Sequence, residues 1–131
     1  MPVGSLKFFF DNNLSVQMAD GMKAFGENVT HLQHHFSDNA KDVEWLPWIG
    51  ENEYFLVSRD DAIRRHPAEL ASLKNAKVGA FFLGGKNRNR CEIIRQLVRN
   101  WPQIKQYADK TDRPFAFRVP PSGTKFDRIN L

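Results

Sequence analysis

The chain has 131 residues, of which 41% are hydrophobic and 26% are charged, the composition of an ordinary globular protein. Its single cysteine, Cys91, excludes an intrachain disulfide and a cysteine-rich metal site. No apolar run approaches the roughly 20 residues of a membrane span and no signal-peptide pattern opens the chain, so we expect one cytoplasmic domain over residues 1–131 without membrane contact.

The charges are unevenly distributed along the chain. Residues 1–85 carry 8 basic and 11 acidic side chains, whereas residues 86–131 carry 11 basic and 4 acidic ones, for a net charge of +4. A basic excess in one part of a small chain favours an anionic partner, most often a nucleic acid. A solvated basic face would give the same count.

The first predicted strand spans residues 7–10, where three consecutive phenylalanines indicate burial on both faces. Asp11 follows the strand directly, and Asn12, Asn13 and Ser15 can each cap the helix that comes next. The apolar face of that helix is predicted at Leu14, Met18, Met22 and Phe25. Asp11 is therefore either a helix cap or part of a site at the carboxyl end of a strand.

A second strand is predicted over residues 29–32, and three histidines lie at its end or just after it: His31, His34 and His35. Their spacing fits no standard zinc pattern, so we expect them to be surface residues of a polar loop. Asp42 opens the second helix, which Pro47 is expected to kink or end.

A third strand over residues 54–57 leads into the sequence Ser58-Arg59-Asp60-Asp61. A helical turn is expected over residues 62–65, and a further helix begins at Pro67, since proline is well tolerated in the first helical turn.

The fourth strand is predicted over residues 78–83 and the fifth over residues 115–119. Between them lies the longest helix, from about residue 90, which we expect to break at Pro102. Its predicted apolar stripe consists of Ile93, Ile94, Leu97, Val98 and Trp101. From Pro120 onward we expect a loose tail, so that the core spans about residues 6–119.

The alternation of strands and helices predicts a three-layer α/β/α fold with a mainly parallel sheet of about five strands. Because parallel strands end at the same edge, Asp11, Asp42, Asp60 and Glu44 should meet at one rim. Clustered carboxylates repel one another unless a cation lies among them. Mg²⁺ accepts one or two protein carboxylates, and metal ions at such a site support phosphodiester hydrolysis.

Basic side chains surround the Gly84-Gly85 pair after the fourth strand. The glycines lack the spacing of a P-loop or a dinucleotide fingerprint, so they form either a phosphate cradle or a simple turn. The residues expected to contact RNA phosphates are Lys86, Arg88, Arg90 and Arg59. The alternative for this loop is an ordinary exposed segment.

Several of these segments together resemble a known family. Residues 7–15 resemble the start of PIN-like domains, particularly those of VapC-type toxins from bacterial toxin–antitoxin pairs, and residues 58–69 resemble that family's third strand end and following helix. Residues 78–83 and the pair Trp101-Pro102 lie where that subgroup would have them, so the likeness covers about residues 6–119.

The resemblance implies an endoribonuclease that depends on Mg²⁺ or Mn²⁺, acts on RNA and is neutralised by a small antitoxin protein. Asp11, Asp42 and Asp60 match the family's catalytic and metal-binding acids. Auxiliary roles are expected for Glu44, Asp61, Asn12 and Ser58. The sequence leaves open whether the protein forms a homodimer.

The chain also departs from the family pattern. Many relatives carry a second acid two residues beyond the one matching Asp60, where this chain has Ala62. Another acid often follows the fourth strand, where this chain has Asn87 and Asn89. These differences leave one or two metal ions as alternatives.

Two other functions share the predicted fold. A receiver-like phosphotransfer domain would need an acidic pair at the end of its first strand, but Asp11 is followed by Asn12. A non-catalytic module would bind RNA or protein without cleavage, and Ala62 is the residue that favours it.

Overall fold

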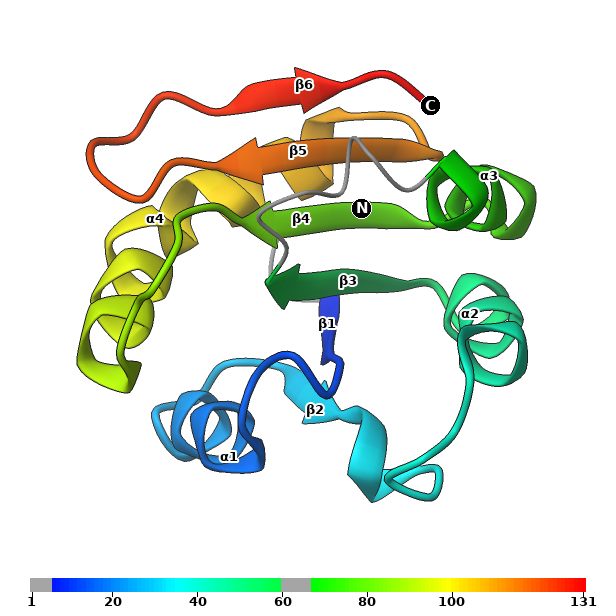
Figure 1. The fold of residues 1–131 in the computed structure, drawn as a ribbon, viewed down its shortest axis with the longest axis horizontal. Helices are drawn as coiled ribbons and strands as arrows, with labels where there is room; N and C mark the ends of the chain where they lie inside the picture. The colour runs from blue at the N-terminus through cyan, green and yellow to red at the C-terminus, as the bar shows by residue number, and fades with distance from the viewer. Residues whose placement is uncertain (1–5, 60–66) are drawn as a thin grey trace.

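Helices and strands alternate along the chain as the sequence predicts (Figure 1). The computed structural model describes residues 6–59 and 67–131. The elements are β1 (Lys7–Phe10), α1 (Val16–Ala24), β2 (Val29–His31), the 3₁₀ helix η2 (Leu32–His34), α2 (Asp42–Glu51), β3 (Tyr54–Arg59), α3 (Pro67–Ala76), β4 (Gly79–Leu83), α4 (Arg90–Lys110), β5 (Phe115–Val119) and β6 (Asp127–Ile129). The helical turn expected over residues 62–65 lies outside the described residues. Within the described part of the chain, no helix is both long enough and apolar enough to cross a membrane.

The described strands form one sheet in the order β2-β1-β3-β4-β5-β6. Strands β1 to β5 pair in parallel, and β6 is antiparallel to β5. Phe10 lies opposite both His31 and Val57, and Arg59 lies opposite Leu83. The parallel strands therefore end at a common edge, and Asp11 emerges there directly after β1.

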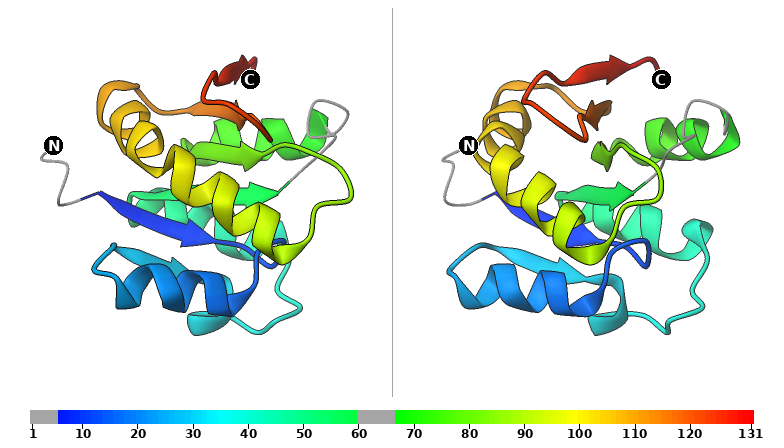
Figure 2. Two further views of the ribbon diagram at one scale, coloured as in Figure 1. Left: turned by 90° about the vertical axis from the view of Figure 1, so that its left-hand side faces the viewer. Right: turned by 60° about the vertical axis from the view of Figure 1, so that its left-hand side comes forward.

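Side chains of β1 alternate between two cores, as the period of a strand requires. Phe8 and Phe10 pack with the layer of α1 and α4, whereas Phe9 packs with α2 and α3. Figure 2 shows α1 and α4 lying together over one face of the sheet. The predicted three-layer α/β/α fold, with a first strand buried on both faces, is confirmed.

The segment after Pro120 is not a loose tail, and the sheet has six strands rather than about five. Phe126 is 9% exposed and stacks on Tyr107 with ring centroids 4.9 Å apart. Ile129 is 4% exposed and packs into the core on the other face. The prediction failed because these two apolar residues lie in an otherwise polar segment, so no strand-like alternation marks them.

Two helices continue through prolines that were expected to interrupt them. α4 includes Pro102 and α2 includes Pro47. Both prolines are exposed, so water can hydrate the backbone groups that they leave unpaired. The expectation that a proline interrupts a helix therefore placed the ends of α2 and α4 too early.

The buried face of α4 differs in part from the predicted stripe. Its members are Ile93, Gln96, Leu97, Asn100, Trp101, Ile104 and Ala108. Val98, predicted for this face, is 57% exposed, because one step along a helix turns the side chain by about 100° from its neighbour. Phe25, predicted for the buried face of α1, is 89% exposed and lies at the C-cap, beyond the last helical residue.

We expect Leu97→Ala to lower the free energy of unfolding by about 2–5 kcal/mol, because it deletes buried methyl groups and leaves a cavity. Leu97 is fully buried between α4 and the sheet. Val98→Ala, at the exposed neighbouring position, is the matched control and should cost less than about 0.5 kcal/mol. Urea unfolding of both variants checks this, and equal losses would show that the wrong face of α4 has been assigned to the core.

Candidate active site

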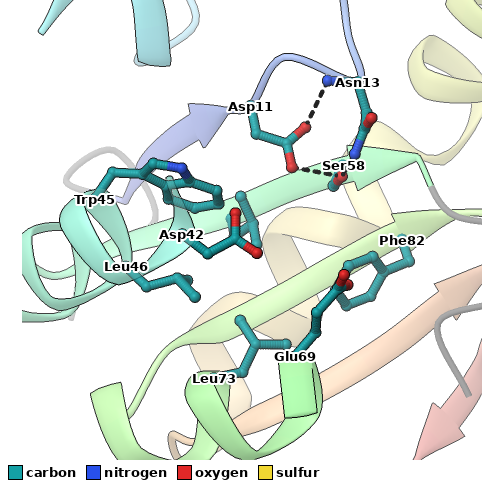
Figure 3. Close-up of a pocket in the computed structure, with 10 residues that line it drawn as sticks. Asp11, Asn13, Asp42, Trp45, Leu46, Ser58, Glu69, Leu73 and Phe82 are labelled. Carbon is teal, nitrogen blue, oxygen red and sulfur yellow. Dashed lines mark hydrogen bonds between the residues drawn. The ribbon is translucent and has the colours of Figure 1, made fainter. Parts of the chain in front are cut away.

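A cavity of about 160 Å³ lies at the carboxyl edge of the sheet (Figure 3). It lies between the ends of β1 and β3 and the first turns of α2 and α3. Its lining residues are Asp11, Asn13, Asp42, Trp45, Leu46, Leu56, Ser58, Glu69, Leu73 and Phe82. The apolar members belong to the α2 and α3 core, and the polar members cluster around a set of carboxyl groups.

Asp11 is a buried residue of this cavity and not a helix cap. Its Oδ2 accepts a hydrogen bond from the Ser58 hydroxyl at 2.7 Å, and its Oδ1 accepts one from the Asn13 backbone N–H at 3.0 Å. The cap of α1 is instead Ser15, whose Oγ accepts from the Met18 N–H at 3.3 Å. Of the two alternatives left open by the sequence, the helix cap is therefore ruled out, and Asp11 lines a cavity at the carboxyl end of β1.

The surroundings of Asp11 favour its protonated form. Burial raises the pKa of Asp11 from its ordinary value of 3.8 to about 7. The hydrogen bonds from Ser58 and Asn13 oppose this rise, and the negative charges of Asp42 and Glu69 add to it. A carboxyl group in such surroundings carries its charge at low cost only when a positive charge is nearby.

Asp42 and Glu69 contribute the other carboxyl groups of the cavity. Asp42 is the first residue of α2, and Glu69 lies in the first turn of α3. Both residues are exposed, so they lie toward the mouth of the cavity while Asp11 lies deeper. Partial burial of the Asp42 carboxyl raises its pKa as well. Figure 3 shows the carboxyl groups of Asp11, Asp42 and Glu69 arranged around the hollow.

Two polar residues of the cavity were not predicted as site residues. Glu69 resembles an ordinary acid in the first turn of a helix, but α3 follows β3 and begins near the edge where the parallel strands end. The topological argument that predicts Asp42 at this edge, from the start of the helix after a parallel strand, also applies to Glu69. The sequence predicts Asn13 only as a helix cap, yet its Nδ2 donates to Ser58 Oγ at 3.1 Å. Ser58 therefore lies between Asn13 and Asp11 in one hydrogen-bonded chain.

Other predicted residues point elsewhere. Glu44 accepts from the Lys41 backbone N–H at 3.3 Å and so belongs to the cap of α2, not to the cavity. Asn12 donates to the Asp38 carbonyl at 2.6 Å, on the exposed side of its loop. Asp60 and Asp61, like Ala62, lie outside the described residues, and their roles stay predictions.

His31 is a buried structural residue, and the prediction that it lies on the surface was wrong. Its Nε2–H donates to the Leu14 carbonyl at 2.8 Å, and its Nδ1 accepts from the Gln33 N–H at 3.0 Å. Burial lowers the pKa of His31, which favours this neutral form. The ring therefore fixes the loop that carries Asp11, with both nitrogens occupied.

The basic loop after β4 is partly tied into the fold. Arg88 donates to the Pro121 carbonyl at 3.1 Å and lies 3.6 Å from the Glu92 carboxylate. Lys86 and Arg90 are exposed, and Arg59 is half-buried at the end of β3. Of the predicted basic residues, these three are the ones open to a phosphate contact.

The glycine pair has a structural explanation. A Cβ at Gly84 would come within 2.5 Å of the Arg118 guanidinium, and Gly85 has a φ of +115° that favours glycine. Asn89, where relatives often have an acid, caps α4 by accepting from the Glu92 N–H at 2.9 Å. A simple turn therefore accounts for both glycines of this loop, and no bound phosphate is needed to explain them.

The chemistry of the donor set fits a hard divalent cation. The ionisable groups of the cavity are all carboxyls, which Mg²⁺ and Mn²⁺ prefer, and no described histidine or cysteine lines it. Among residues 6–59 and 67–131, no three His, Cys, Asp or Glu side chains are close enough to hold one ion together. Mg²⁺ needs only one or two protein carboxylates, because water and phosphate oxygens complete its coordination. Asp11 with Asp42 or Glu69 would suffice.

The three-layer α/β/α fold carries a carboxyl-lined cavity at the ends of its parallel strands. The family model described as PIN like domain matches residues 6–85, more than half of the chain. The chain therefore belongs to the PIN-like domain family, a superfamily that includes nucleases. Comparisons with curated proteins and with solved structures each found no match.

Proposed function

We propose that this protein is an endoribonuclease that uses Mg²⁺ or Mn²⁺. The observation that carries the proposal is the cavity in which a buried Asp11, with a pKa of about 7, shares its surroundings with Asp42 and Glu69. Asp60, directly after the last residue of β3, is proposed as a further acid from its place in the sequence.

The residues of the cavity have separate tasks in this proposal. Ser58 and Asn13 hold the Asp11 carboxyl in one orientation, and each leaves an Asp11 oxygen with a further lone pair for a ligand. Asp42 or Glu69, nearer the mouth, would hold the cation together with Asp11, and water and phosphate oxygens would complete its coordination. When bound, the cation would supply an activated water and stabilise the leaving oxygen of a phosphodiester.

Cleavage of RNA by the purified protein tests the proposal. We expect cleavage with Mg²⁺ or Mn²⁺, none with EDTA, and none from the Asp11→Asn variant purified in the same way, which controls for contaminating ribonuclease. Persistent cleavage in EDTA would contradict a metal-dependent reaction. RNA binding without cleavage in either metal would favour the non-catalytic module, and labelling of Asp11 by a small phosphodonor would favour the receiver-like alternative.

Lys86 and Arg90, with Arg59, are proposed to contact RNA phosphates. Replacing Lys86 and Arg90 by Gln should weaken binding to unrelated RNAs to a similar degree and flatten the plot of log K against log salt by about 0.7 for each lost contact with a single strand. Lys74→Gln with Lys110→Gln, on α3 and the end of α4, is the control with the same charge change. An unchanged salt slope in the Lys86 and Arg90 variant would remove this loop from the RNA surface.

We further propose that the protein is the toxin of a toxin–antitoxin pair, on the strength of the resemblance to VapC-type toxins. Expression alone should arrest growth, and co-expression of the neighbouring small open reading frame should restore it. Unaffected growth at high expression would contradict the toxin role without touching the ribonuclease proposal.

A further inference from the structure

An apolar groove of about 360 Å³ separates α1 from α4. The two helices lie side by side over one face of the sheet in both views of Figure 2. The apolar part of the groove is lined by Met18, Met22, Phe25, Ile94 and Val98. The carboxyl-lined cavity has a different set of lining residues, so the groove is a separate feature.

The exposed apolar residues of this region are concentrated in the groove. Phe25 is 89% exposed and Val98 is 57% exposed, and both contribute to its walls. A second, shallower hollow continues from it, lined by Ile94 and Val98 together with Arg95 and Arg99. A contiguous apolar surface of this kind on a small domain marks an interaction site more often than scattered exposed residues do.

The rim of the groove is basic. Arg90 lines the groove itself, and Arg95 and Arg99 line its continuation. None of the described residues that line the groove or its continuation is acidic. An occupant that satisfies this surface must therefore present apolar side chains to the groove and negative charges to its rim.

The charges and side chains of the groove make two other occupants unfavourable. A second copy of the chain seated through the same face would oppose Arg95 and Arg99 of each copy to those of the other, which is unfavourable. A nucleic acid strand would find one aromatic side chain, Phe25, among aliphatic walls, whereas single strands are bound on several aromatic stacking platforms in succession. Phe25 and Val98, the exposed apolar members of the groove, instead provide a surface on which the apolar face of a helix packs well, with Met18 and Met22 at its largely buried floor.

We propose that the groove between α1 and α4 docks an amphipathic helix of a partner protein, whose apolar stripe fills the groove and whose acidic side chains face Arg90, Arg95 and Arg99. This is the helix-in-groove mode of recognition, with apolar anchors spaced i, i+3, i+4 and i+7. The proposal does not depend on ribonuclease activity.

Selection from a library of displayed helical peptides with randomised surface positions tests the proposal. The enriched peptides should combine that apolar spacing with acidic flanking residues.

A synthetic peptide of the enriched sequence should bind the Val98→Glu variant at least about tenfold more weakly than the parent protein, because the new carboxylate lies in the groove. Val43→Glu is the matched control, since Val43 is an exposed valine of α2, and its affinity should stay within about twofold of the parent. The double substitution Arg95→Glu with Arg99→Glu should weaken the binding of acidic peptides more than the binding of neutral peptides.

Several results would overturn the proposal. These are a selection that enriches no peptides or only basic ones, or equal affinities in Val98→Glu and Val43→Glu. A concentration-dependent dimer that Val98→Glu abolishes would assign the groove to a second copy instead. Circular dichroism melting of Val98→Glu shows whether the variant folds. If the Val98→Glu variant still cleaves RNA, a failure of the docking proposal can be told apart from a failure of the ribonuclease proposal.

Discussion

Asp11→Asn should lower kcat/KM for RNA cleavage by roughly a thousandfold or more while the fold survives. The substitution keeps the size of the side chain, and the new amide can still accept from the Asn13 N–H and donate to Ser58 Oγ. Among the described residues that line the cavity, it removes the one deeply buried carboxylate. The steady-state rate on a defined oligoribonucleotide measures the loss, and circular dichroism shows whether the variant is folded.

Two variants on the same helix provide an internal control for that result. Asp42→Asn, inside the cavity, should also impair cleavage strongly. Glu44→Gln, which alters a carboxylate of the helix cap two residues away, should leave the rate within about threefold of the parent. Equal losses from Asp42→Asn and Glu44→Gln would indicate that a general change of charge, and not the cavity, controls the rate.

In EDTA, the stability that Asp11 contributes should fall as the pH rises from about 4 to about 7. The pKa of Asp11 is about 7 in the folded protein and 3.8 ordinarily, so over this interval the folded state binds more protons than the unfolded state. The contribution is complete below the unfolded pKa, is lost as the pH rises through the folded pKa, and is constant above it. The full change is on the order of 4 kcal/mol.

The comparison with Asp11→Asn isolates this effect from all other titrating groups. Relative to the parent, the variant should gain stability in urea unfolding as the pH rises from 4 to 8, by up to about 4 kcal/mol. A stability difference between the two proteins that does not change with pH would show that Asp11 has an ordinary pKa in the fold.

The sequence predicted the main features of the site because topology fixes them. Three phenylalanines marked a strand buried on both faces, and the alternation of elements put Asp11 and Asp42 at one edge of a parallel sheet. Such arguments depend only on where an element ends, and they place a residue to within about one helical turn.

The errors concern side-chain direction and long-range packing. Glu44 lies only two residues from Asp42, but the cap of α2 turns its carboxylate away from the cavity. Val98 fits the apolar stripe of a helix by its spacing, yet it is the neighbouring Leu97 that is buried in the core. β6 forms because β5 offers a free edge and the α4 layer offers Tyr107, and neither is encoded in the local sequence of β6.

We propose that the carboxyl cavity binds a divalent cation, and the melting temperature of the protein in rising concentrations of Mn²⁺ at pH 8 tests this binding most directly. At this pH Asp11 is mostly ionised, so protons compete little with the metal. A cation that binds only the folded site stabilises it by about 2.7 kcal/mol at a concentration one hundred times its Kd. We therefore predict that Mn²⁺ raises the melting temperature of the parent protein clearly, that of Glu44→Gln equally, and that of Asp11→Asn far less. Equal shifts in the parent and Asp11→Asn would contradict the claim.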